Sequence, residues 1–305
     1  MNESAYLGGR KPMMQVSELW AKGDSIQIVN QVVNGYEGDE VEIQSPLYPA
    51  VMRFFYKLVP ILDINGIYVL GAIISSAFLA LALFYLGKIF DILWFNDEKG
   101  FMVYAILIFF PTSFFFNLVS VDALFLLLSV LFLLSMFKKK YLLASVFLGL
   151  SIAAKTFGIV LSVPFIAYVF MIERHNKKFK MVPKLATFLI TAFIPPAICF
   201  YYIHSFTGSL GSIIGNQGFM WLPLAYFFEL FTKTNPQYLL AHILNAALLM
   251  VGMGLVIYSF IKLYFVWEGR SPEQVTIFVY ALVYILGVSS FSADAPIMEL
   301  LGVCL

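Results

Sequence analysis

Apolar residues dominate this chain of 305 residues from about residue 66 onward, in long runs separated by short charged segments. A hydrocarbon core about 30 Å thick takes about 20 helical residues, so the pattern predicts a series of membrane helices. The runs cover residues 66–90, 100–117, 119–137, 141–154, 157–172, 182–204, 238–265 and 275–290. We therefore expect an all-α, polytopic membrane protein with about eight membrane helices, some of them short and broken.

Two of the apolar stretches are too long for a single crossing. As single helices, residues 100–137 would be roughly 57 Å long and residues 141–172 roughly 48 Å long. We expect the first stretch to fold back between Pro111 and Ser120, and the second to break at "AAKTFG", residues 153–158. The short helices that result are typical of segments that line a cavity rather than lipid.

The basic residues of the loops fall unevenly on the two sides of the membrane once both breaks are made. One side collects 12 Lys and Arg, and the other collects seven. The positive-inside rule places the richer side in the cytoplasm. Residues 1–45, with the acidic cluster "YEGDEVE", then form an extracytoplasmic segment, and residues 46–305 form the polytopic membrane domain. Asp122, Lys155 and the loop 205–237 share the outer face.

Composition narrows the class of protein further. The chain is 61% hydrophobic and only 12% charged, against about 25% charged in soluble proteins. The net charge is +1 and the basic residues lie in short loops, so nucleic acid is not an expected partner. Cys199 and Cys304 show no metal-ligand spacing, and no P-loop, dinucleotide-binding or zinc-protease motif occurs. We therefore expect no metal and no cofactor.

Two ionisable residues stand out within the apolar runs. Asp122 is the single ionisable group of residues 109–137, and an intramembrane carboxylate indicates a functional site. The alternative is that Asp122, with Ser120, caps its helix or forms a structural pair. Lys155 lies in the second break, where its ammonium can face an anion while its stem packs on apolar surface. Simple snorkelling, or pairing with Asp122, remains open for Lys155.

Four weaker candidates lie in or beside the loop "FTGSLGSIIGNQGFMWLP", residues 206–223. His204, near the outer end of its run, is positioned to orient an acceptor or a phosphate, although an interfacial histidine is often structural. The four glycines of the loop allow it to fold closely over a ligand, and Asn216 and Gln217 offer amide donors and acceptors. Trp221 offers an aromatic face in the same outer loop.

A serial order of short motifs resembles a known family. The pieces are "GDSIQIVNQVVNGYEG", "SPLYPAVMR", "FFPTSFFFNLVSVDALF" with "IAAKTFG" after it, and "FTGSLGSIIGNQGFMWLP". Together they span roughly residues 18–225 and resemble the polytopic glycosyltransferases of the C superfamily. They are most similar to the mannosyltransferases that add the second mannose in GPI-anchor assembly, and to their prokaryotic relatives.

The resemblance implies an activity and a set of roles. The family transfers a hexose, here expected to be mannose, from a polyprenyl (dolichyl) phosphate to a lipid-linked or protein acceptor outside the cytoplasm, with inversion. Asp24 matches the acidic first-loop position and is the expected base, with Asp39 the second candidate and otherwise a substrate-binding residue. Lys155 is expected to bind the donor phosphate. Without the resemblance, "KGDS" is typical of a turn that precedes a helix, and Asp24 of a loop or capping residue.

The chain departs from the family pattern at several places. Trp20 and Asp24 are separated by three residues where the family has Trp-Asp, and Asp122 stands where the family has Glu. Lys155 stands where the family has Arg, which keeps the positive charge but loses the planar guanidinium that can bind an anion through two hydrogen bonds. The family is also longer, with a span before the first outer loop and more spans after residue 290. A fragment, an alternative start and a partner subunit that supplies the missing span all remain open.

The expected location is the plasma membrane of a prokaryote or the endoplasmic reticulum membrane. Two other functions compete with sugar transfer. A secondary transporter or lipid flippase also uses broken helices with ionisable groups, but it is typically built from internal repeats, which the hydropathy of this chain does not show. A non-catalytic fragment is the third interpretation.

Overall fold

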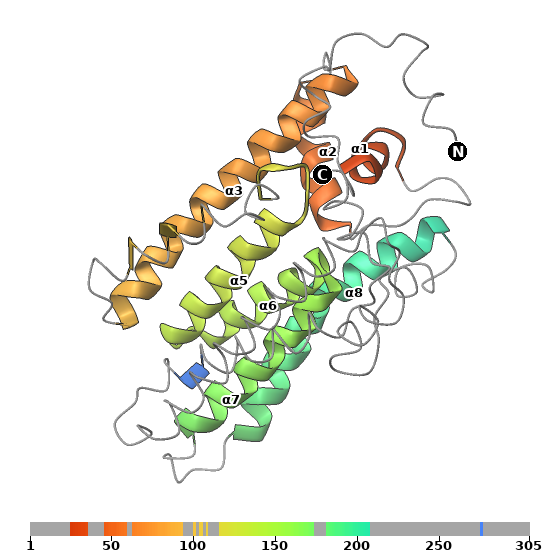
Figure 1. Cartoon of the computed structure of the whole chain (residues 1–305). Coiled ribbons are helices and arrows are strands. Elements are labelled where there is room, and N and C mark those ends of the chain that lie inside the picture. The colour runs from red at the N-terminus through yellow and green to blue at the C-terminus, as the bar shows by residue number, and fades with distance from the viewer. Residues whose placement is uncertain are drawn as a thin grey trace, which may run out of the picture.

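The computed structural model describes residues 25–35, 46–59, 63–93, 100–101, 104–105, 108, 116–173, 181–207 and 275–276. This part of the chain is all-helical, with seven α-helices and no strand (Figure 1). The α-helices are α1 (Ser25–Asn34), α2 (Leu47–Leu58), α3 (Ile64–Leu93), α5 (Asp122–Phe137), α6 (Tyr141–Ala154), α7 (Ser162–Glu173) and α8 (Met181–Thr207). A 3₁₀-helix, η4 (Thr156–Leu161), joins α6 to α7. The all-α class predicted from the sequence is confirmed for these residues.

Helix α3 is long and apolar enough to cross a membrane. Its most apolar 18-residue window has a mean hydropathy of 2.4, and its 30 residues extend about 45 Å, more than the roughly 30 Å of a hydrocarbon core. It contains the predicted run 66–90. Helices α5 and α6, with 16 and 14 residues, are apolar but shorter than a full crossing.

Both predicted interruptions border these short helices. Residues 118–121 are not helical, and α5 begins at Asp122. Helix α6 ends at Ala154, and Lys155 has an extended backbone, with φ −149° and ψ 122°. The break predicted at residues 153–158 is therefore confirmed.

Contacts along α3 show how it lies against α5. In the first half of α3, the Ser76 hydroxyl donates to Asn117 Oδ1, just ahead of α5, at 3.2 Å. Near its end, Ile89 packs in the same apolar cluster as Phe132 of α5. The two helices therefore run side by side in the same direction (Figure 1).

The remaining helices alternate in direction. Helix α6 returns antiparallel to α5, because Lys155 just beyond its end reaches Asp122 at the start of α5. The rings of Tyr141 and Phe188 lie 5.6 Å apart, so the starts of α6 and α8 are together. We call the end of the bundle that holds α1, α2, Asp122, Lys155 and the last turns of α8 the α2 end. The turn Lys138–Lys140 lies at the opposite end.

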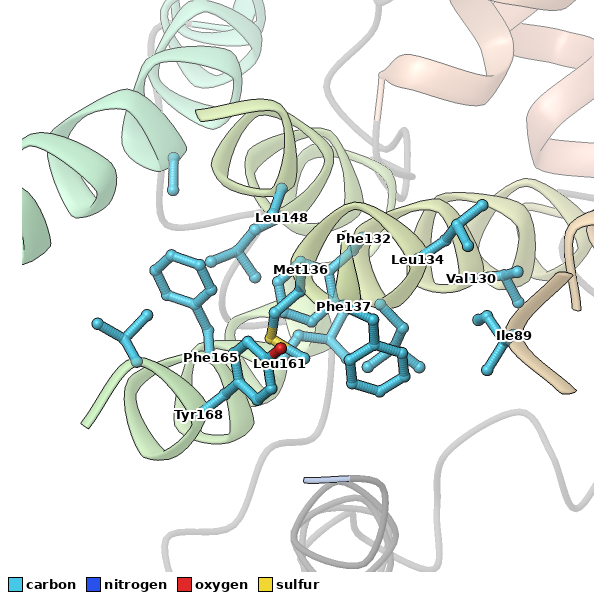
Figure 2. Packing of buried hydrophobic residues seen from close by; sticks show 14 of the residues in the cluster. Ile89, Val130, Phe132, Leu134, Met136, Phe137, Leu148, Leu161, Phe165 and Tyr168 are labelled. Carbon is cyan, nitrogen blue, oxygen red and sulfur yellow. The ribbon is translucent and has the colours of Figure 1, made fainter. Parts of the chain in front are cut away.

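The main core lies toward the end opposite the α2 end (Figure 2). It is built from α3, α5, α6, η4, α7 and α8, and its aromatic members interlock, with Phe132 and Phe165 ring centroids 6.0 Å apart. Phe137 and Tyr168 are similarly placed at 5.8 Å. Both ring pairs are tilted, and contacts between rings that are not stacked face to face add packing energy to simple burial.

Helix α6 packs closely because most of its buried positions are small. Ala144, Ser145, Gly149, Ser151, Ala153 and Ala154 are buried, together with Leu148 and Ile152. The two serine hydroxyls bond back to carbonyls of their own helix, Leu142 O and Phe147 O, at 2.8 Å each. Small residues let helix backbones approach one another, which is how helices associate when lipid surrounds them. Helix α6 thus lies between α5 and α8.

A second apolar cluster joins the N-terminal helices to the bundle. Helix α1 buries Ile28, Val29 and Val32, spaced for one helix face, against α2 and the first part of α3. The sequence predicted a water-exposed segment for residues 1–45, with its boundary at residue 45. Residues 25–34 instead share a core with helices beyond that boundary. The described helix α1 starts at Ser25, the last residue of "KGDS", so the turn predicted there lies outside the described residues.

Candidate functional site

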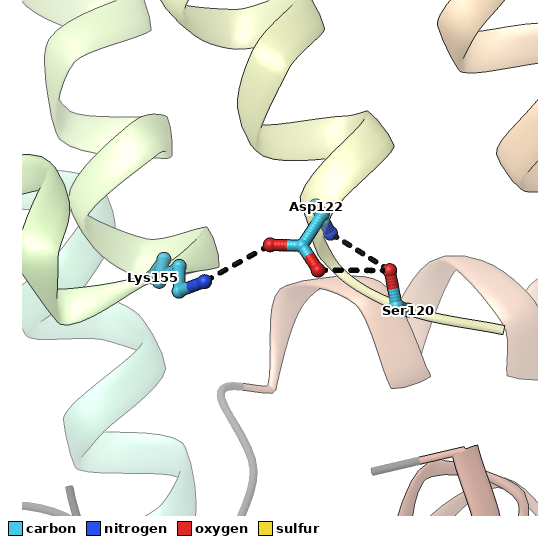
Figure 3. A network of polar contacts seen from close by, with 3 residues as sticks. All are labelled: Ser120, Asp122 and Lys155. Atoms are coloured by element: carbon cyan, nitrogen blue, oxygen red, sulfur yellow. Dashed lines mark hydrogen bonds and ion pairs between the residues drawn. The ribbon is translucent and has the colours of Figure 1, made fainter. Parts of the chain in front are cut away.

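Asp122 and Lys155 form an ion pair at the α2 end (Figure 3). Lys155 Nζ donates to Asp122 Oδ1 at 2.9 Å. The Ser120 hydroxyl donates to the other carboxylate oxygen, Oδ2, at 3.2 Å, and its oxygen accepts the Asp122 backbone N–H at 3.2 Å. Both carboxylate oxygens therefore have a protein donor, which fixes the orientation of the Asp122 side chain.

The local structure explains why these two charges face each other. Asp122 is the first residue of α5, where free N–H groups and the helix dipole favour a negative charge. Lys155 follows the last residue of α6, where the dipole favours a positive charge. Since α5 and α6 are antiparallel, their oppositely polarised ends meet at the same place. Each charge is thus favourable for its own helix and for its partner.

The ion pair is not sealed in the core. The Lys155 side chain is 42% exposed and the Asp122 side chain 37% exposed, so solvent or a solute reaches both. A carboxylate held by an ammonium stays ionised and is a weaker proton acceptor than an unpaired one. Asp122 is therefore better suited to orienting Lys155 than to acting as a general base. Lys155 presents a positioned ammonium to the solvent at the α2 end.

Apolar packing holds both residues of the pair in place. Val119 and Leu124 flank Asp122, Ala154 precedes Lys155, and all three belong to the cluster that includes α1 and α2. The side chain of Val119 is fully buried and packs against Gly71 of α3, where an added Cβ would lie 2.8 Å from a Val119 methyl group. The ion pair is therefore tied directly to the packing of the N-terminal helices.

Tyr48 fixes α2 to α3 beside this site. Its buried hydroxyl donates to Gly71 O at 3.1 Å and lies 2.7 Å from Ser75 Oγ. Burial raises the pKa of the Tyr48 phenol to about 12, so the hydroxyl remains a donor at neutral pH. Because Tyr48 has one proton, Ser75 is the donor in the second bond. The "PLYP" element thus anchors α2 at the end that carries Asp122 and Lys155.

The structure brings two of the predicted site residues together. Pairing of Lys155 with Asp122, one of the alternatives left open by the sequence, is confirmed. His204 lies in the last turn of α8, which ends at Thr207. The other five candidates, Asp24, Asp39, Asn216, Gln217 and Trp221, lie outside the described residues, so their roles stay predictions.

Two cations of α2 were not singled out from the sequence. Arg53 and Lys57 are spaced four apart, which places them on one face of α2. That spacing, within an amphipathic helix that precedes a long apolar run, is the signal that could have found them. Among the described residues no group of three His, Cys, Asp or Glu side chains is placed to hold a metal ion. The expectation that no metal is needed stays a prediction.

Removing one member of the ion pair is expected to destabilise the protein more than removing both. Lys155→Gln leaves the Asp122 carboxylate without its cation, whereas Lys155→Gln with Asp122→Asn leaves two neutral partners. Because both side chains are more than a third exposed, we expect a coupling free energy of about 0.2–1 kcal/mol at low salt. Equilibrium unfolding in mixed micelles of the original chain, Lys155→Gln, Asp122→Asn and the double variant measures this coupling.

The salt dependence of the coupling provides the control. An exposed ion pair weakens as the ionic strength rises, so the coupling is expected to fall by half or more in 1 M salt. Ser120→Ala serves as the matched variant, since it removes hydrogen bonds to Asp122 but no charge. A coupling that is zero at low salt, or unchanged at high salt, would contradict the ion pair as described.

The site is characterised by its internal geometry. It consists of a solvent-accessible ammonium, the carboxylate that orients it, and an anchored pair of short helices at the same end of a long apolar bundle. No protein-family model, curated protein or solved structure matches this chain.

Proposed function

We propose that the protein is a polytopic membrane glycosyltransferase. It moves a hexose, expected to be mannose, from a polyprenyl phosphate to a lipid-linked or protein acceptor on the extracytoplasmic side. The observation that carries the proposal is the ion pair of Asp122 and Lys155 at the end of the bundle where α1 begins, directly after Asp24. Motifs distant in the sequence, each part of the resemblance to the C superfamily, thus meet at one end.

The helix directions support the proposed topology. Helices α5, α6, α7 and α8 alternate, so the ends that border residues 174–180 lie at the same end as Lys138–Lys140. The turn Lys138–Lys140 and the helix ends that border the basic residues 174–180 thus lie away from the α2 end, and the positive-inside rule would place that side in the cytoplasm. In this proposal the α2 end faces the extracytoplasmic side, and the short helices α5 and α6 border a cavity open to it.

The proposed reaction uses few protein groups. The Asp24 carboxylate takes the proton of the acceptor hydroxyl as its oxygen forms a bond to the anomeric carbon. The bond from that carbon to the donor phosphate oxygen breaks on the opposite face, and the phosphate leaves with the electron pair. The Lys155 ammonium stabilises the charge that grows on the phosphate, and Asp122 positions Lys155. The prenyl chain stays in the membrane.

Membranes that contain the chain test the proposal directly. Supplied with labelled polyprenyl-phosphate mannose, they are expected to transfer label to an endogenous lipid or protein acceptor. Lys155→Gln is expected to lower the rate by about a hundredfold, the usual effect of removing one group that stabilises a developing anion. Lys138→Gln, an exposed lysine at the opposite end, is the matched control and should leave the rate unchanged.

Other outcomes of this assay favour the competing functions. Exchange of the labelled lipid across the membrane without transfer would indicate a carrier or flippase. Absence of both activities, in membranes where the chain is inserted and folded, would indicate a non-catalytic fragment or the need for a partner subunit. Transfer that is insensitive to Lys155→Gln would support the glycosyltransferase activity but contradict the proposed role of Lys155.

A further inference from the structure

A groove at the α2 end is separate from the Asp122–Lys155 pair. It has a volume of about 400 Å³ and runs between α2 and the last part of α8. Neither Asp122 nor Lys155 lines it. Its walls are mostly apolar, formed by side chains such as Leu47, Phe54 and Ile198. An open groove with apolar walls beside a membrane helix suits a hydrocarbon chain.

Two cations mark one side of the groove. Arg53 and Lys57 of α2 both line it, and among its described lining residues there is no carboxylate. No ion pair to either cation is present in the part of the chain that the structure describes. The Arg53 guanidinium lies near Gly35, at the end of α1, which keeps it beside the groove. The groove therefore combines an apolar floor with two positive charges that have no carboxylate partner among the described residues.

The surface around the groove is also apolar. On α2, Phe54 is 62% exposed and Leu58 is 64% exposed. On α8, Ile198 and Tyr201 are 63% and 76% exposed. Large apolar side chains gathered beside cations are typical of a helix that lies in the membrane interface, with its apolar side in the acyl region and its cations among headgroups.

We infer that this groove binds an anionic phospholipid, whose phosphate contacts Arg53 and Lys57 and whose acyl chain occupies the apolar groove between α2 and α8. Charge complementarity favours this occupant over a neutral lipid, and the exposed apolar surface favours it over free phosphate. The lipid would tie α2 to α8 and so fix the α2 end in the membrane interface. This inference goes beyond the proposed function, since it involves no sugar transfer and holds for a transporter or an inactive fragment as well.

Lipid retention by the purified full chain tests the inference. The protein in mild detergent is mixed with equal amounts of phosphatidylglycerol and phosphatidylcholine, and bound lipid is counted by native mass spectrometry. We expect preferential retention of phosphatidylglycerol. Arg53→Gln combined with Lys57→Gln should weaken that retention about twenty-five-fold, because each cation near an anionic headgroup contributes about fivefold. Lys138→Gln with Lys140→Gln, the same charge change at the opposite end, should have no effect.

Two further variants separate the parts of the site. Ala50→Trp places a large ring in the groove from an exposed position, so it should lower lipid retention without disturbing the fold. Arg53→Lys with Lys57→Arg keeps both charges and should retain phosphatidylglycerol like the original chain. Each variant is compared with the original by elution profile and thermal unfolding, so that loss of fold is distinguished from loss of lipid.

Three results would overturn the inference. Equal retention of phosphatidylcholine and phosphatidylglycerol would show that the cations do not select a charged headgroup. Unchanged retention in the Arg53→Gln, Lys57→Gln protein would place the lipid elsewhere. Displacement of phosphatidylglycerol by inorganic phosphate at an equal concentration would show that the groove recognises a free anion and not a lipid.

Discussion

Asp24→Asn is expected to abolish sugar transfer while the protein still inserts into the membrane and folds. Loss of a positioned general base usually lowers a rate by about a hundredfold to ten-thousandfold. Asparagine has nearly the size of aspartate but cannot accept the acceptor proton as a carboxylate does. The transfer rate in membranes, normalised to the amount of inserted protein, measures the effect.

The choice of asparagine separates catalysis from capping. Asp24 precedes α1, and aspartate and asparagine are about equally good at a helix N-terminus. If Asp24 only capped α1, Asp24→Asn would leave both activity and stability intact, and Asp24→Ala would lower stability by about 1 kcal/mol. Asp39→Asn, at the second candidate base, is the matched comparison. Full activity of Asp24→Asn would end the assignment, and loss of activity in Asp39→Asn alone would transfer it to Asp39.

Gly149→Ala is expected to destabilise the bundle, although Gly to Ala within a helix usually stabilises by about 0.5–1 kcal/mol. A Cβ at Gly149 would meet the backbone oxygen of Ala192 and would lie 2.9 Å from two ring carbons of Pro195, both in α8. The Ala192 carbonyl has no helical hydrogen bond from residue 196, because Pro196 lacks a backbone N–H. Neither a backbone carbonyl nor a proline ring can rotate away.

The expected cost of Gly149→Ala is about 1–3 kcal/mol, the usual range for overpacking, and Gly149→Leu should cost more. Equilibrium unfolding in mixed micelles provides the measurement. Gly87→Ala is the matched control, because its Cβ would meet the hydroxyl of Tyr104, the far end of a side chain, at 2.6 Å. We expect a change below about 1 kcal/mol there. Equal stability of the two variants would show that α6 and α8 are not packed as closely as described.

The interruptions in the helices could be predicted from the sequence because their causes are local. The helical rise limits how many apolar residues one membrane crossing can hold, and a lysine within a longer stretch marks a place where the chain reaches water. These two facts put a break at residues 153–158, and α6 ends at Ala154. Similar reasoning put the end of the preceding run ahead of Asp122, where α5 begins.

The burial of α1 could not be read from its composition. Residues 1–45 are polar and acidic on average, which indicates a segment in water. Within it, Ile28, Val29 and Val32 form a narrow apolar stripe, and that stripe packs on α2 and α3. The mean composition of 45 residues does not show one apolar helix face. The spacing of the apolar residues within 25–34 indicated burial, and the composition of the whole segment did not.

The helical class, the apolar runs, and the breaks at which a carboxylate and a lysine are exposed depend on residues close together in the chain, so they could be predicted from the sequence. The groups that meet in space are set by how the helices pack against one another. Asp122 finds Lys155 because α5 and α6 are antiparallel, and Arg53 and Lys57 lie beside α8 because α1 and Tyr48 hold α2 in place. Such contacts join residues far apart in the chain, so they follow from the packing of whole helices and not from any local pattern.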